Sequence, residues 1–434
     1  MKQDKIDNLI SLLKASRASA WEITDTTETG WEFYLIGDKL DQHRVRDVNH
    51  VHLRVFTKGE DEGTIGSAEG EISPTADTAE LTKSINTLLD ASGYALNPAW
   101  TLNQPAQHTA ESDAPCPEVD KVSADYLHTL TNLSQDEHAY INSSEVFVTK
   151  VTKRIINSEG LDVTDTYPSS MAEVIVNAKD QEHEIELYRM FTSGTCDTAD
   201  LESRLSKAMR YGKDKLIAKP TPGVGSIDLI LSTEDAFQIF YWYAAHLNAA
   251  YKYMGYSDWN IGQPITESDD GDKLTIIARS SLPNSSRNCR FDSEGAYTHD
   301  LTLMKDNTPA AFYGTRQFSQ YLGLKDSFNA GNLEFTGGIR ASESLLEGDY
   351  LEVVEFSSFE VDDVSGDLAG EIRLGYLHRQ NQVTIVSGGS VSGNMADLIK
   401  TIRFSHEMAQ YDNYLIPSVT RLRNVSIAGG QLDT

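Results

Sequence analysis

One short stretch decides how the chain is divided: Ala218-Lys219-Pro220-Thr221-Pro222-Gly223-Val224-Gly225. Two prolines and two glycines within eight residues are typical of a connection between folded units. Proline cannot continue a helix or a central strand, and glycine favours turns. We therefore take residues 218–225 as a linker. The full length of 434 residues exceeds the usual size of one domain, so we expect two domains, over residues 1–217 and 226–434.

The part before the linker mixes helical and strand-like patterns. Apolar side chains at helical spacing predict helices over residues 6–13, 78–89, 122–133 and 200–211. Alternating patterns predict strands over residues 20–23, 31–36, 51–56, 145–155, 171–178 and 184–191. Turns are expected at Thr29-Gly30 and Gly37-Asp38, and a long exposed loop over the polar residues 97–116. The pattern indicates an N-terminal α+β domain with a mostly antiparallel sheet.

The part after the linker has a different pattern of predicted helices and strands. A short strand over residues 227–231 is followed by Ser232, a candidate N-cap, and by a helix that we expect to run to about Met254. Beyond Asp258, short strand-like runs alternate with glycine-rich turns. Examples are residues 273–278, 350–356, 371–376 and 382–387. The fold class is therefore predicted as α+β, with a β-rich C-terminal domain.

The charge balance excludes some classes of partner. Lys and Arg number 37 and Asp and Glu number 65, which gives a formal net charge of −28. Binding to nucleic acid depends on Lys and Arg displacing counterions from phosphates. Binding to an anionic membrane surface depends on the same residues. We therefore expect neither a nucleic-acid partner nor a membrane partner.

The cysteines and the apolar segments indicate the cellular compartment of the protein. Cys116, Cys196 and Cys289 stand far apart, and their odd number does not indicate a disulfide framework. The first residues lead into an amphipathic stretch rather than the apolar core of a signal peptide. The most apolar window, residues 236–254, is interrupted by polar side chains. We expect a cytoplasmic protein.

The second half of the chain contains short sequence motifs in a defined order. They are Gly271–Ile277, Phe291–Gly295, Tyr313–Arg316, Leu322-Gly323, Gly331-Asn332, Leu346–Leu351, Ser365–Asp367, Gly388–Asn394 and Ile416–Ser418. In this order and spacing they resemble the TldD/PmbA family, also called the TldD/TldE family. The resemblance is good over about residues 225–430. It extends to the first half through Asn157-Ser158-Glu159-Gly160.

The resemblance implies a cytosolic metallopeptidase system. In that system two related subunits pair, and they cleave unfolded or leader peptides inside a closed chamber. One subunit type, TldD, carries a zinc motif H-E-x-x-x-H on a helix and a distant cysteine ligand, whereas the other type, TldE or PmbA, lacks the motif. The family also carries the label "modulator of DNA gyrase", which describes a phenotype rather than a chemistry.

The zinc motif of the family is degenerate in this chain. A peptidase zinc needs three protein ligands with one open position, and a carboxylate that takes a proton from the bound water. An ungapped comparison from the strand at residues 228–231 places Tyr241 at the first His, Trp242 at the Glu and His246 at the last His. No cysteine follows Cys289. We therefore expect no metal ligand, no catalytic residue and no cofactor here, as in the zinc-less TldE/PmbA type.

Two other residue pairs could carry chemistry. His50 and His52 would share one face of a strand and could hold part of a zinc site, but no third ligand is evident nearby. A solvated strand face is the explanation that we favour. Asp292 and Glu294 flank a serine before Gly295 and could do acid–base work. The alternative is an ordinary polar turn.

The paired glycines offer a candidate peptide groove. Gly337-Gly338 and Gly388-Gly389 permit positive φ angles and close backbone approach. In a β-rich domain such positions can border a groove where an extended peptide adds as a strand through main-chain hydrogen bonds. Ordinary tight turns are the alternative. Main-chain recognition would suit an unfolded peptide, because it does not depend on the identity of the side chains.

These observations lead to one functional expectation and one alternative. The chain is expected to be a TldE/PmbA-like subunit that pairs with a TldD-like subunit or with itself. It would shape the peptide chamber without catalysing hydrolysis alone. The alternative is a stand-alone homodimeric binding or scaffold protein that kept the fold and lost the peptidase activity.

Overall fold

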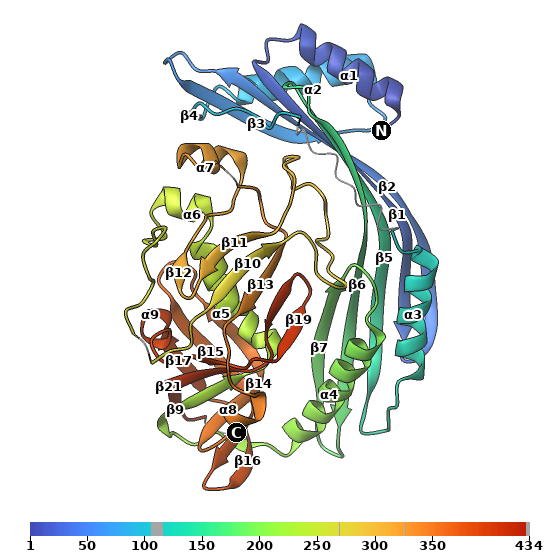
Figure 1. Cartoon of the computed structure of the whole chain (residues 1–434). Coiled ribbons are helices and arrows are strands. Elements are labelled where there is room, and N and C mark those ends of the chain that lie inside the picture. The colour runs from blue at the N-terminus through green and yellow to red at the C-terminus, as the bar shows by residue number, and fades with distance from the viewer. Residues whose placement is uncertain (106–115, 269, 326, 431–434) are drawn as a thin grey trace.

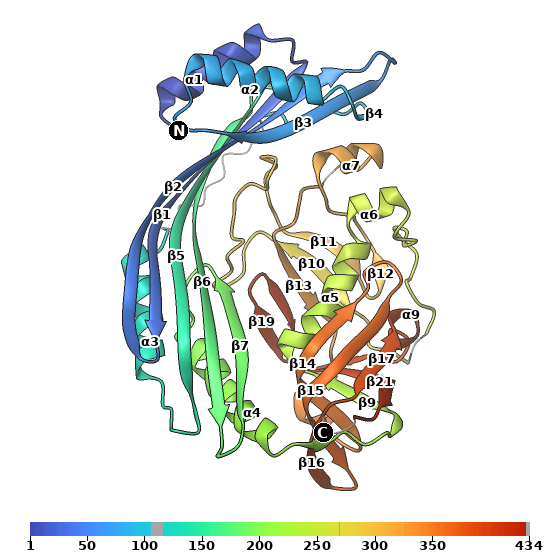
Figure 2. The same ribbon diagram turned by 180° about the vertical axis from the view of Figure 1, so that it is seen from behind.

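The computed structural model describes residues 1–105, 116–268, 270–325 and 327–430. Figures 1 and 2 show a long, bent sheet from the N-terminal half that curves around one side of a β-rich C-terminal unit. Half of the predicted loop over residues 97–116, namely residues 106–115, lies outside the described residues. Within the described part of the chain, no helix has the length and apolar character needed to cross a membrane.

The N-terminal sheet has seven strands. They are β1 (Ala20–Ile36), β2 (Lys39–Lys58), β3 (Thr64–Ile72), β4 (Leu96–Pro98), β5 (Ala139–Asn157), β6 (Asp162–Lys179) and β7 (Glu184–Ser193). Their order is β4-β3-β2-β1-β5-β6-β7, and all neighbours are antiparallel. The predicted α+β class and the mostly antiparallel sheet are therefore confirmed.

The strands are longer than the sequence patterns indicate. Residues 20–23 and 31–36 belong to one continuous strand, so the turn predicted at Thr29-Gly30 is wrong. Gly30 lies in the middle of β1 opposite Thr149 of β5, where a side chain would collide with the Val148 carbonyl. The glycine thus permits close packing of two strands rather than a reversal of the chain. The turn at Gly37-Asp38 is present between β1 and β2.

Four helices cover one face of this sheet. They are α1 (Gln3–Ala15), α2 (Thr78–Ala91), α3 (Val119–Asn132) and α4 (Thr198–Leu216). The α1–α2 cluster contains Trp21 and Ile23 of β1, and the α3–α4 cluster contains Phe33 and Leu35 of the same strand. Alternate residues of a strand share one face. The helices therefore lie on a single side, and the other face turns toward the C-terminal unit (Figure 1).

The C-terminal unit contains two mixed sheets. The first has the order β12-β11-β10-β13-β20-β19, and the second the order β14-β9-β21-β17-β15-β16-β8 with β18 beside β21. The strands are β8 (Lys219–Pro220), β9 (Gly225–Leu231), β10 (Thr275–Arg279), β11 (Leu301–Lys305), β12 (Thr308–Pro309), β13 (Asn332–Thr336), β14 (Tyr350–Val361), β15 (Asp367–Arg379), β16 (Gln382–Ser387), β17 (Ser390–Asn394), β18 (Arg403–Phe404), β19 (Met408–Tyr411), β20 (Tyr414–Pro417) and β21 (Thr420–Ala428).

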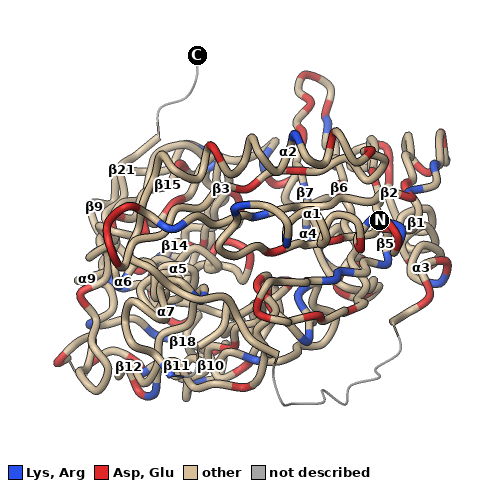
Figure 3. Tube along the Cα trace, turned by 90° about the horizontal axis from the view of Figure 1, so that it is seen from above, with Lys and Arg blue, Asp and Glu red and all other residues tan. Residues whose placement is uncertain are grey.

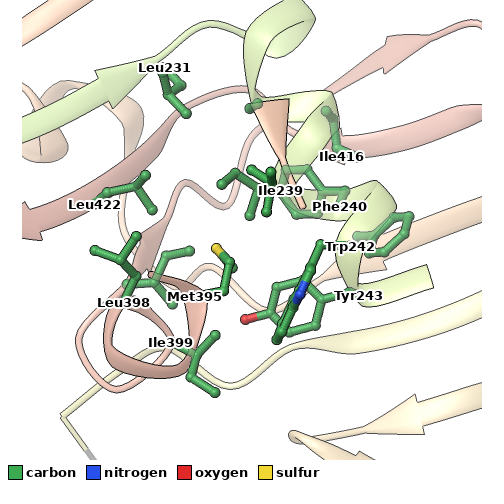
Figure 4. Packing of buried hydrophobic residues seen from close by; sticks show 14 of the residues in the cluster. Leu231, Ile239, Phe240, Trp242, Tyr243, Met395, Leu398, Ile399, Ile416 and Leu422 are labelled. Carbon is green, nitrogen blue, oxygen red and sulfur yellow. The ribbon is translucent and has the colours of Figure 1, made fainter. Parts of the chain in front are cut away.

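Short helices accompany these sheets, and α5 is central to the core. The helices are α5 (Thr233–His246), α6 (Ala249–Met254), α7 (Arg316–Tyr321), α8 (Ser342–Leu345) and α9 (Met395–Leu398). Phe240 of α5 packs against Phe335 and Phe404, with ring centroids 5.1 and 5.6 Å apart. Figure 4 shows α5 side chains meeting Met395 and Ile399 in one apolar cluster. The position of α5 in this core explains why the sequence of this helix is unusually apolar.

The helix predicted from Ser232 to Met254 is two helices. The first ends at His246, and Asn248 caps the second by accepting a hydrogen bond from the Ala250 backbone N–H at 2.8 Å. An asparagine at an N-cap competes with helix continuation because its side chain replaces a backbone acceptor. The chain therefore changes direction directly after His246, the last position of the degenerate motif.

The predicted linker contributes to the C-terminal sheet. Lys219 and Pro220 pair with β16, and the Thr221 backbone N–H donates to the Ser387 carbonyl at 3.0 Å. Gly225 begins β9 with a φ angle of 78°. The stretch thus enters the second sheet directly. The domain boundaries at residues 217 and 226 stay a prediction.

Candidate functional site

The three degenerate motif positions lie on α5 in different environments. Tyr241 is 42% exposed, whereas Trp242 and His246 are buried. Trp242 packs on Tyr243, with ring centroids 5.2 Å apart. Figure 4 shows the Trp242 indole within the apolar cluster of the C-terminal unit. The helical spacing therefore turns the first motif position outward and the other two into the core.

His246 is enclosed by aromatic rings. Its imidazole lies 4.6 Å from the Trp242 ring and stacks on Trp259 at 4.8 Å between centroids. Neither Nδ1 nor Nε2 has a hydrogen-bond partner among the described residues. Burial lowers the pKa of His246 from its usual value, so the ring is held neutral near pH 7. This histidine contributes to core packing.

These side chains do not fit a peptidase zinc site. Such a site needs three nitrogen, sulfur or oxygen ligands around one point, together with a carboxylate base. The Trp242 position holds an indole, whose N–H cannot ligate a metal or accept a proton. Among the described residues, no group of three or more His, Cys, Asp and Glu side chains could hold a metal ion. The assignment of Tyr241, Trp242 and His246 as a lost site stays a prediction.

The two histidines lie within β2 and are both exposed. His50 Nδ1 is 2.7 Å from Glu71 Oε1, and both side chains are more than half exposed. His52 is exposed and is the cross-strand partner of Glu71. An exposed imidazole–carboxylate contact of this kind is typical of a solvated sheet surface.

The predicted groove glycines lie where chain segments approach one another closely. A side chain at Gly337 would collide with the Lys273 carbonyl, and one at Gly338 with the Ser405 carbonyl. Gly388 and Gly389 have φ angles of 76° and 83°. At all these positions glycine is required by the chain's own backbone. Gly337 and Gly338 also line a surface cavity, but a role for the four glycines in peptide binding stays a prediction.

The pair Asp292 and Glu294 proves to be part of a larger buried group. Both side chains are buried in a loop that docks on the N-terminal sheet. Asp292 accepts hydrogen bonds from the backbone N–H groups of Glu294, Ala296 and Asn329, at 2.8 to 2.9 Å. Glu294 accepts one from the Arg316 N–H at 2.6 Å. Asp292 therefore organises this loop.

The N-terminal sheet supplies the charges that face this loop. Arg54 of β2 lies 3.7 Å from a Glu294 carboxylate oxygen. Asp165 of β6 accepts from Arg290 Nε at 2.9 Å and from the Arg290 backbone N–H at 2.5 Å. These contacts join residues more than 120 positions apart. The sequence pattern offered no signal for them, because charged residues in alternating strands are expected to face solvent.

Glu22 of β1 is the most unusual member of this group. Its side chain is buried, and Oε2 has no hydrogen-bond partner among the described residues. Burial, followed by the nearby Glu294 carboxylate, raises the pKa of Glu22 to about 8. Burial also raises the pKa values of Asp292 and Glu294. We call the contact between the N-terminal sheet and loop residues 287–298 the junction. It therefore holds carboxyl groups that bind protons more tightly than exposed ones.

Comparison with known proteins gives one family match and several structural matches. Residues 224–429 match the family model described as the PmbA/TldA metallopeptidase C-terminal domain. No curated protein matches the chain by sequence.

Three solved structures share the fold over nearly the whole chain. TldE from Thermococcus kodakarensis has a TM-score of 0.76 at 14% identity, and covers 98% of this chain and 100% of its own. A protein named as a candidate modulator of DNA gyrase from Thermotoga maritima has a TM-score of 0.75 at 15% identity, with the same coverage. Another of that name from Bacteroides thetaiotaomicron has a TM-score of 0.77 at 15% identity, and covers 99% of both chains.

The two kinds of match support each other. The family model accounts for the unit that contains α5 and both mixed sheets, and the solved structures extend the same fold to the N-terminal half. The resemblance found in the sequence motifs is therefore confirmed. Residues 224–429, which form most of the C-terminal unit, match the PmbA/TldA metallopeptidase C-terminal domain, and the whole chain shares the fold of TldE.

Proposed function

We propose that this chain is the TldE/PmbA-type subunit of a metallopeptidase system, and that it shapes the peptide chamber without hydrolysing peptides itself. One observation carries the proposal. At the α5 positions where TldD-type relatives are expected to hold zinc, this chain has an exposed phenol, a buried indole and a neutral histidine within an aromatic cluster. Such side chains supply neither a ligand set nor a base.

The remainder of the chain is suited to a non-catalytic subunit. The fold around α5 is complete, because Trp242 and His246 fill the interior with apolar and aromatic contacts. Acidic residues are distributed along the described chain (Figure 3), and the formal net charge of the full sequence is −28. A surface of this sign attracts basic segments of unfolded peptides at low ionic strength. A cytoplasmic location is part of the proposal.

The catalytic zinc would come from a paired TldD-type subunit. The proposed assembly is a heterodimer with such a relative, in which the metal and its base lie on the relative's own helix. The family label concerning DNA gyrase leads to no proposed contact, because the formal net charge of the sequence is −28 and DNA binding depends on Lys and Arg.

The test compares the chain alone with the chain purified together with a TldD-type relative that has an intact H-E-x-x-x-H motif. The readouts are cleavage of a fluorescence-quenched unfolded peptide, with and without a chelator, and the mass of the complex by light scattering. We expect no chelator-sensitive cleavage by the chain alone, and cleavage by the complex that depends on the glutamate of the relative's motif.

A variant of this chain provides the control. Tyr241→Phe removes the exposed phenol oxygen at the first motif position and should leave the activity of the complex unchanged. Chelator-sensitive cleavage by the chain alone, reduced by Tyr241→Phe, would contradict the proposal. A stable homodimer that neither binds the relative nor cleaves peptide would instead support the stand-alone binding protein.

A further inference from the structure

A separate cavity lies where the concave face of the N-terminal sheet meets the C-terminal unit. Its volume is about 350 Å³. It is lined by β5 and β6, by loop residues 287–298, and by residues 329–331 and Asn413. This volume is at the lower end of the range for small-molecule sites, roughly 300–1,000 Å³. No residue of α5 lines the cavity, so it is distinct from the degenerate motif.

The wall of the cavity has an apolar part and a neutral polar part. Ile155, Val163 and Phe291 supply apolar surface. Burial raises the pKa of the Cys289 thiol to about 11 and also raises the pKa of Tyr167, so both groups are uncharged near pH 7. An occupant would therefore meet apolar side chains and two neutral hydrogen-bonding groups on these sides.

The two carboxylates in the wall already have partners. Asp165 is ion-paired with Arg290 at 2.9 Å. Asp292 accepts three backbone N–H groups of its own loop and of Asn329. These carboxylates hold the loop on the sheet. Their hydrogen-bonding capacity is largely used within the protein, so they are not suited to receive a cationic ligand.

The two remaining cations have no such partner. Lys153 of β5 and Arg287 of the loop both line the cavity, and within the described residues neither side chain has a hydrogen bond or an ion pair. Lys153 is half-buried between Val151 and Ile155, which are buried on the same face of β5. The charged side chains of the wall are thus two cations, Lys153 and Arg287, and two carboxylates, Asp165 and Asp292, and Arg290 beside the wall compensates the charge of Asp165.

We propose that this cavity binds a carboxylate attached to a compact apolar group, with Lys153 and Arg287 as the cationic contacts. Charge-assisted hydrogen bonds to a carboxylate are among the stronger polar contacts in proteins. A dianion such as a phosphate is less suited, because the lining cations do not outnumber the lining carboxylates and Asp292 lies in the same wall. The ligand is either the C-terminal residue of a peptide or a free carboxylic acid of similar size.

The test measures binding to the full chain by isothermal titration calorimetry. The probes are N-acetyl-leucine, its amide, and the dipeptide N-acetyl-alanyl-leucine with a free carboxylate. Both acids should bind at least tenfold more tightly than the amide. Tighter binding of the dipeptide indicates a peptide end as the ligand, and tighter binding of N-acetyl-leucine indicates a free acid.

Variants locate the binding to this cavity. Lys153→Gln and Arg287→Gln should each weaken binding of the preferred acid at least tenfold, whereas Lys153→Arg should retain it. Lys150→Gln is the matched control, because Lys150 is exposed on the opposite face of the same strand. Thermal unfolding of each variant establishes that it is folded. Equal binding of acid and amide, absence of binding by both acids, or an unchanged affinity in Lys153→Gln would overturn the proposal.

Discussion

Two regions of the molecule differ in whether buried polar side chains have hydrogen-bond partners. Around α5, the polar atoms of Trp242 and His246 are buried among aromatic rings without hydrogen-bond partners in the described part of the chain. At the junction between the sheet and loop 287–298, Asp165 and Asp292 are buried with several partners each. Packing thus dominates the first region, and electrostatics the second.

The difference shows where chemistry remains available in this fold. A helix that has become part of the hydrophobic core cannot expose reactive groups without losing packing energy. The junction instead retains charges, a cavity and unusual proton affinities, all of which depend on how two distant parts of the chain meet. If this comparison is correct, substitutions in the two regions should have distinct physical signatures.

The largest effect is expected for Trp242→Ala. Removing a buried indole from the core should lower the free energy of unfolding by about 3–5 kcal/mol. Tyr241→Ala, one position earlier and 42% exposed, should cost about 1 kcal/mol or less. Urea denaturation, monitored by far-ultraviolet circular dichroism, measures both values. Similar losses for the two variants would show that Trp242 is not an ordinary core residue.

The next effect concerns the buried ion pair between Arg189 of β7 and Glu355 of β14. Their side chains are 9% and 10% exposed, and Arg189 Nη1 lies 3.3 Å from Glu355 Oε2. Glu355→Gln leaves the guanidinium buried without its countercharge, which should cost about 3 kcal/mol.

The double variant Arg189→Met/Glu355→Leu separates the charge from the packing. It should be closer to the wild-type protein in stability than Glu355→Gln is, because both charges of the pair are removed together. Urea denaturation of the single and double variants measures the difference. A double variant as unstable as the single one would mean that the pair holds the two units together through its geometry, not only through charge compensation.

The sequence predicted much of the fold for identifiable reasons. Ile6, Leu9 and Leu13 are buried as their helical spacing indicates, and the alternating pattern located the strands. Strand lengths were underestimated, because exposed polar residues in β2 such as Gln42 and Arg44 have no apolar periodicity. The bent sheet extends beyond its own core, and pairing with β1 keeps these residues extended.

The candidate sites were less predictable. The degenerate motif could be located because it lies within one helix. The junction could not be located from the sequence, because it joins Glu22, Arg54 and Asp165 to residues near position 290. Nothing local distinguishes Glu22 from the other acidic residues of its strand. Its burial depends on the docking of a loop about 270 residues later in the chain.

A pH experiment tests the assignment of Glu22. The group has a pKa of about 8 in the folded protein, against 4.5 as the ordinary value. Between these values the folded state holds a proton that the unfolded state has released, so stability falls as the pH rises and levels off above pH 8. From pH 6 to pH 8 this contribution should cost roughly 2 kcal/mol.

The variant Glu22→Gln isolates this contribution. It cannot ionise, so it should lose about 2 kcal/mol less than the wild-type protein between pH 6 and pH 8. Denaturation curves at both pH values provide the comparison, and titrating groups that do not interact with Glu22 cancel in the difference. Glu60→Gln, at an exposed position after β2, is the control and should follow the wild-type protein. Parallel curves for Glu22→Gln and the wild-type protein would contradict a protonated Glu22.

The smallest effects distinguish a binding residue from a structural one within the same cavity wall. Arg290→Gln breaks the pair with the buried Asp165 and should cost about 1–3 kcal/mol in stability. Lys153→Gln breaks no contact within the described residues and should change stability by less than about 0.5 kcal/mol. Thermal and urea denaturation measure both. A large loss for Lys153→Gln would mean that its charge stabilises the junction, in which case weaker ligand binding in that variant would no longer identify Lys153 as a direct contact.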